Sequence, residues 1–96
     1  MKSFIVDQIE ITRGGFVQVR FHKLSSDGAL LGNHRTSIEP GGNIDKQFAA
    51  VNAHLAQEGF APLAENELDR VRRHVIVAHT PEVVAAYKAE LARRAQ

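Results

Sequence analysis

The chain has 96 residues, no cysteine and a formal net charge of +1. A chain of this length forms a single domain, and without cysteine it contains no disulfide and no zinc or iron–sulfur site held by thiolates. The near-balanced charge lacks the basic excess that is typical of nucleic-acid binders. No apolar stretch approaches the roughly 18 residues that a membrane span needs.

The small size of the domain favours association with another chain. A domain of this length buries only about 60–65% of the surface that its unfolded chain exposes, and small domains often gain stability by oligomerisation. At the amino end, Asp7 interrupts the first apolar residues too early for a signal peptide. The absence of cysteine also fits a reducing compartment. We therefore expect a cytoplasmic protein without a membrane anchor that self-associates or binds a partner.

The first half of the sequence predicts a three-stranded antiparallel β-meander. Residues 4–12 and 16–24 alternate between apolar and polar side chains, and the pair Gly14-Gly15 between them is a strong hairpin signal. Residues 25–28 (SSDG) predict the second turn, because serine and aspartate bond their own backbone and glycine tolerates positive φ. A third strand follows over residues 29–38, with a bulge or bend expected near Gly32 and Asn33.

The second half predicts three α-helices, which makes the fold class α+β. Asn43 is a suitable N-cap for a helix that Gly59 closes. A second helix is expected over residues 65–79, although residues 75–77 (VIV) could also form a short strand. Thr80-Pro81 is a helix start. The third helix carries an apolar stripe that should face the core, formed by Val84, Tyr87 and Leu91.

The preferred candidate site is the face of the sheet that no helix can cover. Helices cover one face of a small sheet, so the other face meets water or a partner. On the second and third strands this face should carry polar and cationic side chains that suit a protein contact. The residues assigned to it are Gln18, Arg20, His22, His34 and Arg35. A secondary candidate is the basic cluster of Arg70, Arg72 and Arg73, which could instead pair with the acids around it.

Other kinds of site receive less support from the sequence. The five histidines lack the spacing of a zinc-binding helix, so we expect no metal or cofactor. Ser25 and Ser26 lie in a turn without the flanking glycines of a nucleophile elbow, so we predict no catalytic residue and no enzymatic activity. Residues 40–43 (PGGN) precede a helix as a phosphate-binding loop does. They lack the lysine of a P-loop, and a plain loop with an N-cap is the preferred interpretation.

Three stretches resemble small uncharacterised proteins of tailed phages and prophages: residues 34–41 (HRTSIEPG), 49–55 (AAVNAHL) and 79–87 (HTPEVVAAY). The resemblance implies a short accessory protein of phage or prophage origin that acts inside the bacterial host. It transfers no catalytic residue.

Three functions follow as expectations from that origin. The first is an inhibitor that binds a bacterial defence protein, as an anti-CRISPR protein does. The second is a virion or tail-assembly accessory protein. The third is a binder that sequesters a nucleotide signal. The near-neutral charge argues against a DNA mimic, which needs a strong acidic excess.

Overall fold

The computed structural model describes residues 1–96 and has the α+β arrangement that the sequence predicts. The strands pair with their chain neighbours in an antiparallel sheet of order β1-β2-β3. The strands are β1 (Ser3–Ile11), β2 (Val17–Leu24) and β3 (Leu30–Ile38), and the helices are α1 (Ile44–Ala56), α2 (Glu65–Ala78) and α3 (Pro81–Arg94). Residues 75–77 belong to the last turn of α2, so the helical alternative holds there.

Local sequence signals fix where these elements begin and end. Gly15 (φ 90°) and Gly28 (φ 88°) lie in the two hairpin turns in a conformation that costs most other residues energy. At the start of α1, the Asn43 side chain accepts a hydrogen bond from the Lys46 amide at 3.0 Å. At the start of α3, the Thr80 hydroxyl accepts one from the Val83 amide at 3.2 Å. Both caps satisfy amides that have no partner within the helix.

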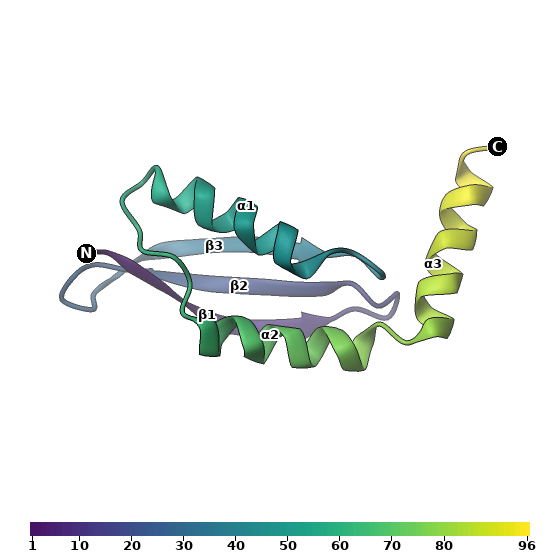
Figure 1. Cartoon of the computed structure of the whole chain (residues 1–96), viewed down its shortest axis with the longest axis horizontal. Helices are drawn as coiled ribbons and strands as arrows, with labels where there is room; N and C mark the ends of the chain where they lie inside the picture. The colour runs from purple at the N-terminus through teal and green to yellow at the C-terminus, as the bar shows by residue number, and fades with distance from the viewer.

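The core lies between one face of the sheet and the two helices α1 and α2, which lie side by side along it (Figure 1). At its centre, the ring of Phe21 makes edge-to-face contacts with Phe4 (5.4 Å between centroids) and Phe48 (5.8 Å). This geometry adds to the stabilisation from burial alone. The core consists of 13 buried apolar residues: Phe4, Val6, Val17, Val19, Phe21, Ile38, Phe48, Val51, Leu55, Phe60, Leu63, Val71 and Val75.

Two irregularities adjust which side chains face this core. In β1 the register shifts between Val6 and Gln8, so that Val6 before the shift and Ile9 after it both face the helices. The odd spacing of these two residues would otherwise place them on opposite faces. A second shift lies between Lys23, which pairs with Gly32, and Leu24, which pairs with Leu30, so Leu31 is the extra residue in β3. The irregularity expected near Gly32 is therefore confirmed.

The third helix does not join the core, contrary to the sequence-based expectation. No residue of α3 is buried, including the predicted stripe of Val84, Tyr87 and Leu91. The helix stands across the end of the sheet, beside the turn between β1 and β2 (Figure 1). The reason is geometric, because α1 and α2 already occupy the one covered face of a three-stranded sheet. None of the three helices has the length and apolar content to cross a bilayer.

Candidate partner-binding face

The face of the sheet opposite α1 and α2 is uncovered, and we call it the open face. Along β2 its residues alternate with the buried Val17, Val19 and Phe21, as period-two geometry requires. A shallow depression of about 400 Å³ lies on it. The side chains assigned to this face by register are Gln8, Glu10, Gln18, Arg20, His22, Asn33, Arg35 and Ser37.

Two arginines lie directly opposite each other across the depression. Arg20 on β2 is in register with Arg35 on β3, and both line the depression. Arg20 is balanced by Asp7, since a guanidinium nitrogen lies 2.5 Å from the Asp7 carboxylate and Nε donates to it at 2.7 Å. Arg35 is exposed and forms no ion pair in the structure. Like charges opposite each other across strands are unfavourable, so an anionic group bound beside Arg35 would stabilise this part of the sheet.

Asp7 is a part of this site that sequence reasoning missed. Its carboxylate lies 3.1 Å from His22 Nε2 as well as beside Arg20, so it connects two of the predicted residues. The register shift of β1 next to it allows this placement. The available signal was the change of apolar spacing from Phe4 and Val6 to Ile9 and Ile11, which marks an extra residue in the strand.

The expectation that His34 shares the open face with Arg35 is wrong. Consecutive residues of a strand point to opposite faces, and His34 is in register with the buried Phe21. Its ring stacks on Phe21 at 6.1 Å and on His54 of α1 at 5.4 Å. His34 therefore belongs to the contact between β3 and α1.

The surroundings of His34 disfavour its protonation. Burial is the largest cause that lowers the pKa of this imidazole, and the nearby His54 and Lys23 lower it further. Glu58 acts in the opposite direction, but less strongly. The folded protein therefore keeps His34 neutral to a lower pH than the unfolded chain does.

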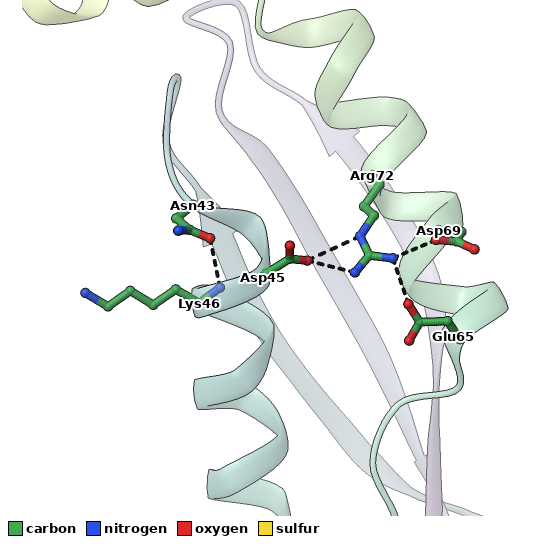
Figure 2. A network of polar contacts seen from close by, with 6 residues as sticks. All are labelled: Asn43, Asp45, Lys46, Glu65, Asp69 and Arg72. Atoms are coloured by element: carbon green, nitrogen blue, oxygen red, sulfur yellow. Dashed lines mark hydrogen bonds and ion pairs between the residues drawn. The ribbon is translucent and has the colours of Figure 1, made fainter.

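The secondary candidate on α2 divides into one structural arginine and two free ones. Arg72 lies between α1 and α2 and contacts three carboxylates, as Figure 2 shows: Asp45 at 2.8 Å, Glu65 at 2.8 Å and Asp69 at 2.7 Å. These contacts raise the pKa of Arg72 above its ordinary value, the bond to Asp45 most of all. Arg72 thus connects two helices and has little capacity left for a partner.

Arg70 and Arg73 are exposed and form no ion pair. They lie on α2 near two apolar side chains with unusual exposure, Ile76 (75%) and Val77 (73%). This part of α2 is a second exposed surface with cationic and apolar side chains, separate from the open face.

The titratable side chains and the 40–43 loop are the remaining candidates for a site. No polar or charged residue is buried, and no three His, Asp or Glu residues are grouped in a way that could hold a metal ion. In the 40–43 loop, Asn43 is occupied as the cap of α1, and Gly41 lies against Val84 of α3. The loop thus supports two helices in this structure.

Comparison with known protein families, with curated proteins and with solved structures found no match to this chain.

Proposed function

We propose that the protein is a non-enzymatic binding protein that uses its open face to bind another protein in the bacterial cytoplasm. The observation that carries the proposal is the pair of arginines in register across the depression, only one of which has a carboxylate partner. A carboxylate of a partner placed beside Arg35 would balance this charge. A charged contact of this kind gives specificity and orientation to an interface.

The polar lining of the depression also suits a protein surface. Gln8, Gln18 and Ser37 supply donors and acceptors around the arginines, and Glu10 adds one negative charge. A face with both charges and several neutral hydrogen-bonding groups matches the polar part of an interface between proteins. The resemblance to small phage proteins makes a bacterial defence protein the first candidate for the bound protein.

The test is capture from bacterial lysate with immobilised wild-type protein and two variants. Arg35→Glu reverses the unpaired charge on the open face, and Arg73→Glu reverses an equally exposed arginine on α2. We expect a defence protein that the wild type and Arg73→Glu retain and that Arg35→Glu loses. Loss of a desolvated charge contact costs about 2–5 kcal/mol, which is roughly a 30-fold or larger decrease in affinity.

The same experiment separates the alternatives. Capture that survives Arg35→Glu but is lost in Arg73→Glu would assign binding to α2 and refute the role of the open face. Recovery of virion proteins from infected cells would favour the assembly role, and recovery of a nucleotide alone would favour the sequestering role.

A further inference from the structure

The sheet has two edges, and the edge formed by β1 is partly occupied. The amide of Ala61 donates to the carbonyl oxygen of Lys2 at 2.8 Å, and Lys2 is also bridged to Phe60. Further along β1, the register shift at Asp7 interrupts the regular strand. Covering segments and bulges are two of the ways in which proteins protect an edge strand from further pairing.

The edge formed by β3 has no such protection along most of its length (Figure 1). Alternate amides and carbonyls of an edge strand point away from the sheet. Apart from the pairing with β2, no backbone group of residues 30–38 takes part in a hydrogen bond within the chain. Pairing with β2 is regular over residues 33–38, so the outward groups form a continuous row about 20 Å long.

The helix α1 lies over β3 without covering this row. Gln47 Nε2 donates to the hydroxyl of Thr36 at 2.6 Å, and the ring of His54 stacks on that of His34 at 5.4 Å. Both contacts are made to side chains, whereas the hydrogen-bonding groups of a strand lie in the plane of the sheet. Ala50 is on the same side of α1, since it is three residues from Gln47 and four from His54, and it is exposed. A strand beside β3 would therefore meet a small, uncovered side chain here.

The side chains of β3 indicate what kind of strand would fit. Arg35 is exposed on the open face and forms no ion pair. Opposite charges directly across two neighbouring strands are stabilising. On the other side of the strand, His34 and Thr36 are half-buried beneath α1. A fitting strand thus carries a carboxylate opposite Arg35 and apolar side chains on its alternate positions.

A second copy of β3 cannot supply that carboxylate. The strand, with the sequence LLGNHRTSI, contains no aspartate and no glutamate. Two β3 strands paired with each other would leave Arg35 without an anion in both copies. Charged residues on natural edge strands work against self-pairing in this way. The edge therefore suits an acidic segment of a different protein better than a second copy.

We propose that an extended segment of a partner protein adds to the sheet as a fourth strand beside β3. Main-chain hydrogen bonds to the free edge supply affinity, and the alternate side chains supply specificity, as in other cases of strand addition. The segment alternates between acidic or polar residues towards the open face and apolar residues towards α1. The inference rests on the proposed function, because it names the part of the bound protein that meets Arg35.

The probes for the test are two eight-residue peptides with blocked ends, in which valine alternates with glutamate or with lysine. We expect the wild type to bind the glutamate peptide more tightly, by roughly 2- to 30-fold, because an opposite-charge pair is gained and a like-charge pair is avoided. Arg35→Glu should reverse this preference. Arg73→Glu, which changes an exposed arginine outside the sheet, should keep it. An unchanged preference in Arg35→Glu overturns the proposal.

Hydrogen exchange locates the added strand. With the glutamate peptide at about ten times its Kd, the outward amides of residues 33–38 should exchange about tenfold more slowly, and those of β1 should not change. Methylation of alternate backbone nitrogens of the peptide gives a second measurement. One set of nitrogens faces β3, so its methylation should abolish binding, whereas methylation of the other set should leave binding intact.

The outcomes separate this inference from the proposed function. Peptide binding without slower exchange in β3, or binding that both methylated peptides retain, would mean that side chains of the open face make the contact alone. That result overturns strand addition and leaves the proposed function standing. Slower exchange in β1 instead of β3, or no binding of either peptide, also overturns strand addition. Capture from lysate that does not depend on Arg35 refutes the proposed function, whatever the peptides do.

Discussion

Replacement of Phe48 by alanine is the most direct test of the core. Phe48 is the aromatic residue through which α1 contacts the centre of the sheet. Its side chain is 1% exposed, and its ring lies 5.8 Å from that of Phe21, which is itself fully buried. Phe48→Ala removes this contact and leaves a cavity between α1 and β2. Such a truncation costs about 3–5 kcal/mol, depending on how far the surroundings collapse.

That cost is large for a domain of this size. Natural domains have about 0.05–0.15 kcal/mol of stability per residue, which corresponds to roughly 5–14 kcal/mol for this chain. Each kcal/mol shifts the Tm of such a domain by about 4–8 °C, so Phe48→Ala should lower the Tm by at least about 12 °C. Thermal and urea unfolding, followed by circular dichroism, measure the change.

Phe16→Ala is the matched control, because it removes the same side chain from a half-buried position outside the core. Its Tm should decrease less than that of Phe48→Ala. A drop of less than about 5 °C for Phe48→Ala would mean that α1 does not pack on the sheet through this residue. An equal drop for both variants would mean that burial between sheet and helices does not determine the stability of this fold.

Three further predictions concern individual contacts. Arg72→Met should lower the Tm in low salt and reduce the salt dependence of the melt, because the ion pairs between α1 and α2 disappear; an unchanged salt dependence would count against them. Gly15→Ala should lower the stability by at least about 1 kcal/mol from positive φ alone, and by more because of the contact with Val83. Gly14→Ala is the control and should be nearly neutral, because the space around Gly14 is open. Equal Tm values for the two variants would refute the fit of α3 on this turn. Because the pKa of His34 is lowered from 6.5, the unfolded chain takes up this proton first as the pH falls. The contribution of His34 to the free energy of unfolding is therefore complete above about pH 6.5 and decreases below it. His34→Gln should accordingly lose less stability than the wild type between about pH 7 and 5. A pH dependence of stability equal to that of the wild type in this variant would contradict the lowered pKa of His34.

The sequence by itself determined the elements and their order, because the signals for them are local. The glycines at residues 15 and 28 define the hairpin turns, and Asn43 and Thr80 define two helix starts. Each of these signals acts through the backbone within a few residues. Alternation along β2 also gave the correct orientation of Arg20, since period two within a regular strand needs no knowledge of its neighbours.

The tertiary structure alone decided how distant side chains meet. The register of β3 against Phe21 decided which of the two neighbours His34 and Arg35 faces α1, and it is His34. The shift in β1 brought Asp7 to Arg20, and the packing of α1 beside α2 brought Asp45 to Arg72 across 27 residues of chain. These contacts depend on sheet register and on the limited area of one sheet face. Neither is encoded in a short window of sequence, because each is set by the sum of many small packing terms over the whole core.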